Sequence, residues 1–232
     1  MNTPIALITG ASRGLGQALA AGLAREGYTL ILDARDAQAL SEVAASLPTR
    51  VVAVPGDVTD PAHRAALRDT AASLGGLDLL INNAGTLGAH PLPALADYPV
   101  AELREAFEVN VLAPVALTQL MLPGLRARGG AVLNVTSDAA VEAYSGWGGY
   151  GAAKAALEQV SNVLKAEETA VRVWWVDPGD LRTGMHQQAF PGADISDRPL
   201  PAAVVPGFVR LIAERLPSGR YRAADLVPVA TA

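Results

Sequence analysis

The residues with the clearest capacity for chemistry are a tyrosine and a lysine four positions apart, Tyr150 and Lys154. They stand in a stretch with helical spacing, and at that separation two side chains share one face of a helix. A phenol is almost fully protonated at neutral pH, and lowering its pKa to neutrality requires about 4 kcal/mol. One ammonium about 4 Å away supplies an energy of that order at an effective dielectric constant of ~20. The pair therefore predicts a general acid/base that exchanges a proton with a carbonyl or an alcohol.

Lysine usage supports this interpretation over a surface Tyr beside an unrelated Lys. Lys154 and Lys165 are the only lysines among 18 basic residues, and the others are arginines. A chain that otherwise uses Arg but places Lys one turn after Tyr150 indicates a need for a compact ammonium with rotatable donors.

Two further polar residues are candidates for the same site. Ser137 follows an apolar strand-like run, so its hydroxyl should project at the carboxyl edge of a sheet, where such folds bind ligands. The alternative is that Ser137 caps a local turn with Asp138. Asn110 precedes Pro114 by four residues, so its carbonyl loses the usual helical donor and the helix should kink, leaving an acceptor for water. The alternative is an ordinary proline kink with a solvated Asn.

A glycine-rich turn follows the first predicted strand and reads Thr9-Gly10-Ala11-Ser12-Arg13-Gly14-Leu15-Gly16. Glycines let a backbone turn tightly and approach a pyrophosphate, and the free N–H groups of the following helix favour an anion. A plain strand-to-helix connection is the alternative. The glycine-rich turn follows the first strand of a chain in which strands and helices alternate, and this position favours dinucleotide binding.

The elements that must position these residues alternate along the chain. Short apolar runs predict strands over 5–9, 28–33, 50–54, 77–82, 131–136 and 171–176, with a weaker seventh at 219–223. Helical spacing predicts helices over 15–26, 37–46, 61–74, 100–125 and 151–167. The alternation is typical of βαβ units, so we expect an α/β fold with a Rossmann-like, doubly wound, mainly parallel sheet of about seven strands and helices on both faces.

The 232 residues are predicted to form a single domain, 1–232, in which residues 180–217 form a substrate-binding loop or lid, because prolines interrupt the pattern there. The absence of Cys removes thiolate chemistry, and the three His have no metal-type spacing, so no metal is expected. A net charge of −5 with scattered Arg excludes a basic nucleic-acid surface. No basic leader or apolar stretch of membrane-spanning length is evident, so a cytoplasmic protein without membrane partners is expected. Trp174 and Trp175 are expected in the core.

These motifs together resemble those of the short-chain dehydrogenase/reductases, in the compact single-domain branch with T-G-x3-G-x-G and Y-x3-K. The resemblance covers residues 3 to about 185. The ordered set also includes Asp57-Val58, Asn82-Asn83-Ala84-Gly85, Asn110, Ser137 and Pro178-Gly179 with Thr183. It implies hydride transfer between a nicotinamide and a carbonyl carbon, in which Tyr150 is the acid/base, Lys154 lowers its pKa, Ser137 binds the substrate oxygen, and Asn110 holds a water in a proton relay.

The resemblance also implies the cofactor site. Its predicted residues are Gly10, Ser12, Arg13, Gly14, Leu15, Gly16, Arg35, Asp57, Val58, Asn83, Ala84, Gly85, Tyr150, Lys154, Pro178, Gly179 and Thr183. Asp57 would accept from the adenine amino group, Val58 would pack on the ring, and Thr183 would meet the carboxamide. Helix capping by Asp57 and a simple turn at residues 83–85 are the alternatives.

The end of the second strand bears on the choice between NAD and NADP. An acid there accepts the ribose 2′-hydroxyl of NAD, whereas Arg accommodates the 2′-phosphate of NADP. The acid position of the family falls on Ala34, so Asp33 should point to the other face, and Arg35 and Arg13 could bracket the phosphate. A solvated Arg13 is the alternative. NADP(H) is predicted as the preferred cofactor, with NAD(H) possible.

The predicted substrate wall is mostly apolar and comprises Ala139, Val141, Tyr144, Trp147, Met185, His186 and Phe190. It favours a small hydrophobic or aromatic carbonyl compound. The resemblance implies a homodimer or homotetramer. The tail departs from the family pattern, because Arg220-Tyr221-Arg222 leads to a segment ending at Pro228. The resemblance therefore does not predict the C-terminal wall of the substrate pocket. A nucleotide sensor without turnover is the alternative function, and an epimerase or dehydratase would need a larger C-terminal part.

Overall fold

The computed structural model describes residues 3–227, so Pro228 and the outermost residues of the predicted domain lie outside it. The strands are β1 (Ile5–Ile8), β2 (Thr29–Ala34), β3 (Val51–Pro55), β4 (Leu79–Asn82), β5 (Ala131–Val135), β6 (Arg172–Asp177) and β7 (Gly219–Arg222). They form one seven-stranded sheet in the order β3-β2-β1-β4-β5-β6-β7, and every pairing is parallel. The predicted α/β fold is confirmed, and the weak seventh strand lies at the sheet edge beside β6.

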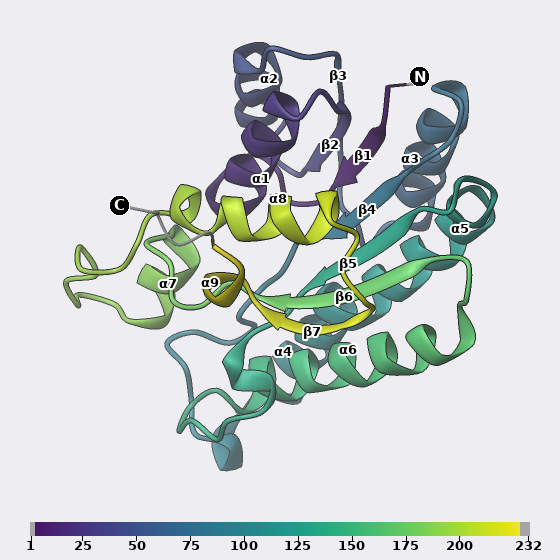
Figure 1. Cartoon of the computed structure of the whole chain (residues 1–232). Coiled ribbons are helices and arrows are strands. Elements are labelled where there is room, and N and C mark those ends of the chain that lie inside the picture. The colour runs from purple at the N-terminus through teal and green to yellow at the C-terminus, as the bar shows by residue number, and fades with distance from the viewer. Residues whose placement is uncertain (1–2, 228–232) are drawn as a thin grey trace.

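Helices cover both faces of this sheet (Figure 1). They are α1 (Gly14–Arg25), α2 (Ala37–Ser46), α3 (Pro61–Ser73), α4 (Val100–Phe107), α5 (Ala113–Arg128), α6 (Gly148–Glu167), α7 (Gly184–Ala189), α8 (Val205–Ala213) and α9 (Ala223–Leu226). One core packs α1, α2, α8 and α9 on the sheet, and the other packs α3, α5 and α6. Buried on both faces, the strands are continuous apolar runs, and Trp174 and Trp175 are buried as expected.

The predicted helix over 100–125 is interrupted where Pro114 was expected to kink it. Residues Glu108–Leu112 form a π-helical turn, in which the Ala113 amide donates to the Glu108 carbonyl five residues back. Wider turns of this kind absorb an interruption in the hydrogen-bond ladder. The chain therefore passes from α4 to α5 as one continuous helical stretch with a bulge at Asn110, instead of the simple proline kink.

The same helical stretch corrects the expectation that no apolar segment of the chain is long enough to span a membrane. Val100–Arg128 is long and apolar enough to cross a membrane by length and composition, but half of its apolar window is buried inside the fold. A core helix passes the same test, and α5 contributes Leu117 and Leu125 to the core beneath the sheet.

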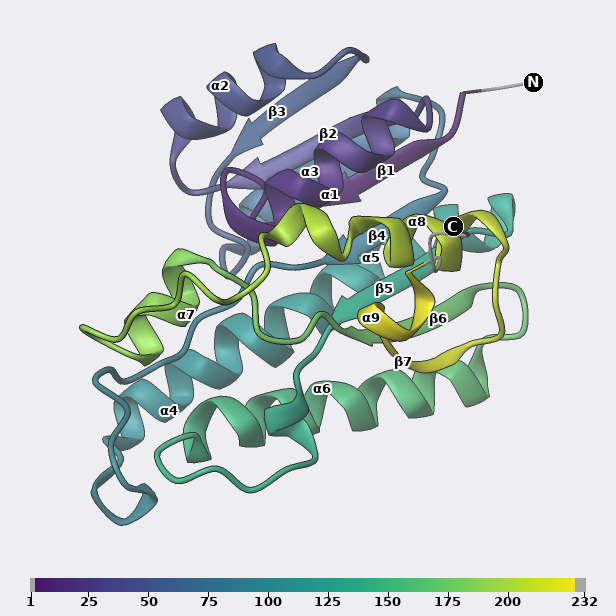
Figure 2. The same cartoon turned by 60° about the vertical axis from the view of Figure 1, so that its left-hand side comes forward.

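Residues 180–217 are only partly irregular, contrary to the prediction. The segment contains α7 and α8, and α8 buries Val205, Phe208 and Leu211 against α1 and the sheet. Pro201 and Pro206 stand in the first turns of helical segments, where a missing N–H costs nothing, so they begin helices instead of breaking them. Figure 2 shows α7 and the loop after it projecting beyond the strands' carboxyl ends, while α8 lies on the sheet.

Candidate active site

The side chain of Lys154 lies in the interior of the site, on the helix that also carries Tyr150. Helix α6 begins at Gly148, three residues earlier than predicted, so Tyr150 stands in its first turn. Lys154 is 4% exposed, and its Nζ donates to the Val135 carbonyl at 2.8 Å and lies 5.6 Å from the Tyr150 ring centroid. The hydrogen bond fixes the ammonium at the carboxyl end of β5. The structure thus brings Tyr150 and Lys154 together as the sequence predicts.

The expected acidification of Tyr150 is wrong for the protein chain by itself. Burial raises the pKa of Tyr150 above its ordinary value, hydrogen bonding with Ser137 opposes the increase, and the carboxylates of Asp177 and Asp138 add to it. Burial also lowers the pKa of Lys154 from 10.5 to about 8. Desolvation is the largest cause of both shifts, and it disfavours the phenolate and the ammonium alike. Tyr150 is therefore held in its protonated form.

Ser137 lies at the carboxyl end of β5 and caps the turn that follows. Its Oγ accepts from the Ala139 amide at 3.2 Å and donates to Asp138 Oδ1 at 3.0 Å. The capping alternative from the sequence is therefore present. Ser137 also lowers the pKa of the Tyr150 phenol, against the effect of burial, so the two side chains are neighbours.

Asn110 is fully buried and holds the loop after β4. Its Oδ1 accepts from the Thr86 amide at 3.1 Å, and its Nδ2 donates to the Thr86 carbonyl at 2.8 Å. A Cβ built on Gly85 would lie 2.9 Å from Asn110 Oδ1 and 3.8 Å from Lys154 Nζ. Gly85 is thus the point at which the π-helical turn, the β4 loop and the lysine converge, and only a residue without a side chain fits there.

A charged network behind Ser137 went unrecognised in the sequence. Arg220 of β7 donates from Nη2 to the Ser137 carbonyl at 3.2 Å and from Nε to Glu158 Oε1 at 2.9 Å. Thr136 donates to the same Glu158 oxygen at 2.8 Å. Asp177 lies 3.8 Å from the guanidinium. The edge strand in the unusual tail therefore supports the strand end that carries the predicted catalytic serine.

The glycine turn is tied to β4 by Thr9, a second residue missing from the predicted site. Thr9 Oγ1 accepts from the Asn83 and Ala84 amides at 3.0 Å each, and Asn83 Nδ2 donates to the Thr9 and Gly10 carbonyls at 2.8 and 3.1 Å. A Cβ on Gly16 would lie 2.3 Å from the Gly10 carbonyl oxygen. Such close backbone packing leaves the first amides of α1, where Leu15 is buried, open toward the sheet edge.

This cradle fits the pyrophosphate of a dinucleotide. Gly14 has a φ of +58° and faces Thr183, whose Cγ2 lies 3.7 Å from the place of a Cβ. Thr183 accepts from the His186 amide at 3.2 Å and begins α7. In the segment that leads to Thr183, the Gly179 amide donates to Asp177 Oδ1 at 2.8 Å, next to Pro178. The turn with Ser12 and the segment 178–183 thus meet across the sheet edge, as the sequence predicts.

Asp57 and Val58 follow β3 at the adenosine side. Asp57 Oδ1 accepts from the Thr59 amide and hydroxyl at 2.9 and 2.8 Å, while the cap of α3 is Asp60. Burial raises the pKa of Asp57, but the Thr59 hydrogen bonds and the charge of Arg35 outweigh burial and lower it. Val58 is buried. An anionic Asp57 near Arg35 is therefore in place to accept from an amino group.

Asp33 is buried beside the Gly10 backbone of the glycine turn. It is 1% exposed, and its Oδ1 lies 2.6 Å from Nε2 of His63 on α3. Burial raises the pKa of Asp33, and the bond with His63 opposes that increase. Asp33 is thus engaged inside the protein, whereas Arg35 and Arg13 are exposed at the rim.

On the substrate side, an aromatic chain leads outward from the phenol. Trp147 packs edge-on to Tyr150 with 5.6 Å between ring centroids, Phe190 lies 5.9 Å from Trp147, and His186 lies 4.9 Å from Phe190. Ala139, Met185 and Trp147 pack in one cluster with Tyr150. Val141 and Tyr144 are exposed at 60% and 47%.

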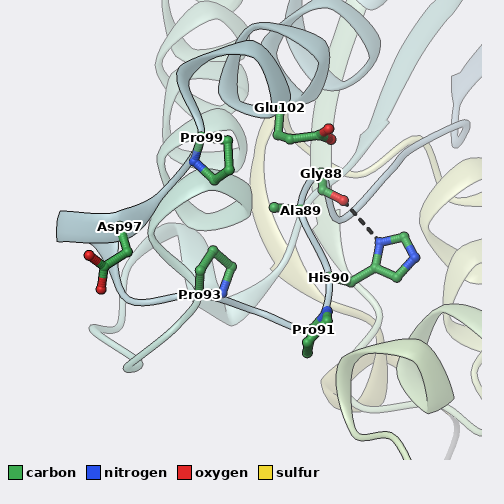
Figure 3. A pocket seen from close by; sticks show the side chains of 8 residues that line it. All are labelled: Gly88, Ala89, His90, Pro91, Pro93, Asp97, Pro99 and Glu102. Carbon is green, nitrogen blue, oxygen red and sulfur yellow. Dashed lines mark hydrogen bonds between the residues drawn. The ribbon is translucent and has the colours of Figure 1, made fainter.

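A separate pocket lies on the segment between β4 and α4. Figure 3 shows its lining residues, which are Gly88, Ala89, His90, Pro91, Pro93, Asp97, Pro99 and Glu102. The imidazole Nδ1 of His90 lies 3.1 Å from the Gly88 carbonyl oxygen. None of these lining residues belongs to the predicted site. Within residues 3–227, no group of three His, Cys, Asp or Glu is arranged to hold a metal ion.

Comparisons with known proteins match this chain to a family and its fold. The family model described as short chain dehydrogenase matches residues 4–194. Serine 3-dehydrogenase from Rhizobium radiobacter is 32% identical over 96% of this chain and 93% of its own length. The 1-deoxy-11-beta-hydroxypentalenate dehydrogenase of Streptomyces exfoliatus is 37% identical over 81% of this chain and 70% of its own length.

One solved structure has a similar fold. A short chain dehydrogenase from Shigella flexneri, complexed with NADP, superimposes with a TM-score of 0.88 at 28% identity, over 97% of this chain and 98% of that one. The matched family transfers hydride with nicotinamide cofactors, and the glycine turn has the close packing that such a cofactor needs. The chain therefore belongs to the short chain dehydrogenase family of NAD(P)(H)-dependent oxidoreductases.

Proposed function

We propose that the protein is an NADPH-dependent reductase of small, apolar, preferably aromatic ketones or aldehydes. The observation that carries the proposal is the convergence of Ser137, Tyr150 and Lys154, with the Tyr150 phenol held in its protonated form. A protonated phenol is the form that donates to a carbonyl oxygen, and the Lys154 ammonium is placed to offset the charge that the phenol carries after donation.

The reaction follows from what each side chain does. Ser137 Oγ turns its proton from Asp138 to the substrate oxygen, which orients the carbonyl toward Tyr150. Tyr150 then donates its proton to that oxygen, and Lys154, fixed on the Val135 carbonyl, offsets the charge that develops on the phenolate. Asn110 keeps the β4 loop in place below them. A bound reduced nicotinamide supplies the hydride.

The preference for NADPH is argued from charge at the end of β2. Ala34 offers no acceptor for a ribose 2′-hydroxyl, and Asp33 is occupied by His63. Arg35 and Arg13 are exposed on the side of Asp57, where a 2′-phosphate would lie. Guanidinium groups bind phosphate through paired, charge-assisted hydrogen bonds.

The aromatic substrate class is argued from the row formed by Trp147, Phe190 and His186 above Tyr150. Aromatic side chains pack favourably edge to face with another ring. A homo-oligomer and a cytoplasmic location remain predictions.

A steady-state assay tests the proposal. NADPH oxidation over a panel of aromatic and aliphatic ketones is measured with the wild type and with Tyr150→Phe. We expect turnover of aromatic ketones and a loss of at least about a hundredfold in the variant, the usual contribution of a positioned acid. Equal turnover by both proteins removes Tyr150 from the chemistry, and cofactor binding without any turnover favours a sensor.

Cofactor preference is tested with Arg35→Ala. We expect the variant to raise the KM for NADPH about tenfold and to leave that for NADH unchanged, because a charged hydrogen bond contributes about 1.5–3 kcal/mol. Arg25→Ala, an exposed Arg at the other end of α1, is the matched control. A higher catalytic efficiency with NADH than with NADPH contradicts the preference.

A further inference from the structure

The carboxylate of Asp138 receives three hydrogen bonds beside the predicted catalytic serine. Its Oδ1 accepts from the Ser137 hydroxyl at 3.0 Å and from the Ala139 amide at 2.8 Å, and its Oδ2 accepts from the Tyr144 hydroxyl at 3.0 Å. Three donors fix both oxygens, so the carboxylate is held at the entrance of the site and does not swing freely into solvent.

The position of the reacting carbonyl sets its distance from this charge. A substrate oxygen bound by Ser137 Oγ lies about 3 Å from that atom. Since Asp138 Oδ1 is itself 3.0 Å from Ser137 Oγ, the reacting oxygen can be no more than about 6 Å from the carboxylate. A carboxylate attached next to the reacting carbonyl would therefore lie within Coulombic reach of Asp138.

The charged groups around the loop that carries Asp138 do not cancel the negative charge of its carboxylate. The Tyr144 hydroxyl, which bonds to Asp138, is also within the electrostatic influence of Glu142 and Asp180. Of the nearby basic groups, His186 lies 3.8 Å from Asp180. Arg220, which reaches the Ser137 carbonyl from behind, is engaged by Glu158 at 2.9 Å. The charges on the loop that carries Asp138 are therefore negative, and the positive charge inside the site is the Lys154 ammonium, which acts alike in the wild type and in Asp138→Asn.

We propose that Asp138 is a specificity-determining residue, which makes the site select uncharged carbonyl substrates over those with a carboxylate next to the reacting carbonyl. This inference depends on the proposed function, because it places the substrate oxygen on Ser137. Because the substrate carboxylate lies about 3 Å beyond the reacting oxygen, the two charges are about 6–9 Å apart, and at an effective dielectric constant of ~40 they repel by an amount that corresponds to about a five- to tenfold effect.

The first test uses two ketones that differ by one charge, methyl benzoylformate and benzoylformate, with NADPH. Because the ester and the acid also differ in reactivity, the measured quantity is the ratio of their kcat/KM values in each protein. We expect Asp138→Asn to lower the wild-type preference for the ester about five- to tenfold. With its oxygen in the place of Oδ1, Asn still accepts from the Ser137 hydroxyl and the Ala139 amide, and its amide nitrogen can donate to the Tyr144 hydroxyl oxygen, so the turn is preserved while the charge is removed.

Glu142→Gln is the matched control. It removes one negative charge from the same loop, but Glu142 is exposed and makes no hydrogen bond to Ser137 among the described residues. We expect its ratio to stay within about twofold of the wild type. An unchanged ratio in Asp138→Asn, or an equal change in Glu142→Gln, overturns the proposal.

A binding measurement separates this inference from the proposed function. Benzamide and benzoate are titrated into the NADP⁺ complex, and quenching of tryptophan fluorescence reports occupancy beside Trp147. We expect benzamide to bind the wild type more tightly than benzoate, and Asp138→Asn to narrow the difference about five- to tenfold. If neither ketone is reduced, the proposed reaction fails and this measurement alone decides the role of Asp138. Failure of benzamide to bind the wild type more tightly than benzoate overturns it.

Discussion

Replacing Lys154 with Met should make the protein more stable while it abolishes turnover. Burial lowers the pKa of the Lys154 ammonium from 10.5 to about 8, and that difference corresponds to about 3 kcal/mol of native-state destabilisation at pH 7. Loss of the 2.8 Å hydrogen bond to the Val135 carbonyl offsets part of the gain, because an unpaired buried carbonyl costs about 1–3 kcal/mol. We therefore expect the unfolding free energy of Lys154→Met to exceed that of the wild type by about 1 kcal/mol at pH 7.

The pH dependence of this difference has a fixed sign. The native state releases the lysine proton at lower pH than the unfolded state does, so the full penalty is present below pH about 8. It is relieved as the pH rises from the native pKa toward 10.5, and wild-type stability should rise relative to that of the variant across this range. Below pH 8 the difference between the two proteins should be flat.

Urea unfolding at neutral pH and at about pH 10, analysed by linear extrapolation, measures both quantities. Lys165→Met is the matched control, since Lys165 is the only other lysine and is exposed. Its stability should remain within about 0.5 kcal/mol of the wild type at either pH. A variant at position 154 that is less stable than the wild type at neutral pH, by a margin that does not change with pH, would refute the reasoning.

Two further predictions concern the cofactor cradle and the network behind the serine. Gly16→Ala should weaken NADPH binding at least tenfold, because its Cβ would lie 2.3 Å from a backbone carbonyl oxygen of the glycine turn. The control Gly124→Ala changes a helix position with open space, so this variant should bind NADPH normally and unfold at a higher temperature. Equal NADPH affinities of the two variants in a titration would contradict the role of Gly16. Arg220→Ala should lower kcat about tenfold with little change in the KM for NADPH, because it releases the Ser137 carbonyl and leaves the Glu158 carboxylate, which is 13% exposed, without its ion-pair partner. Arg222→Ala, whose guanidinium is 65% exposed, should leave kcat within about twofold, and equal losses in the two variants would exclude a specific role for Arg220.

Sequence reasoning predicted those parts of the fold that depend on local pattern. Continuous apolar runs gave the parallel strands, and the helix boundaries agree within a few residues, because burial on both faces leaves a direct trace in the sequence. The prolines at 201 and 206 were misinterpreted for a related reason. Proline ends a helix when it stands inside one but begins a helix in its first turn, and the local sequence does not separate the two cases.

The contacts that the sequence could not predict are those between distant residues. Arg220 reaches the Ser137 carbonyl across 83 positions, and the bond between Asp33 and His63 joins residues 30 apart. The alternation of strand side chains did place Asp33 on the inner face, which was a signal for a buried partner. The direction of the pKa shift at Tyr150 cannot be predicted from the sequence, because it depends on how much water the fold excludes, whereas a turn that Ser137 caps with Asp138 was one of the two interpretations of the sequence.

The two pKa shifts at the centre of the site act together on the charge states of Tyr150 and Lys154. Burial disfavours the phenolate of Tyr150 and the ammonium of Lys154 alike, so the chain by itself does not generate the base that alcohol oxidation requires. Carbonyl reduction requires the opposite starting state, a protonated phenol aimed at an oxygen that Ser137 also holds, and burial enforces that state at every physiological pH. The positive charge that would favour the phenolate belongs to oxidised nicotinamide, and the reduced form lacks it. Burial therefore keeps Tyr150 protonated before the reaction and also penalises the phenolate that proton donation leaves behind, and the Lys154 ammonium, fixed on the Val135 carbonyl, is placed to offset that penalty.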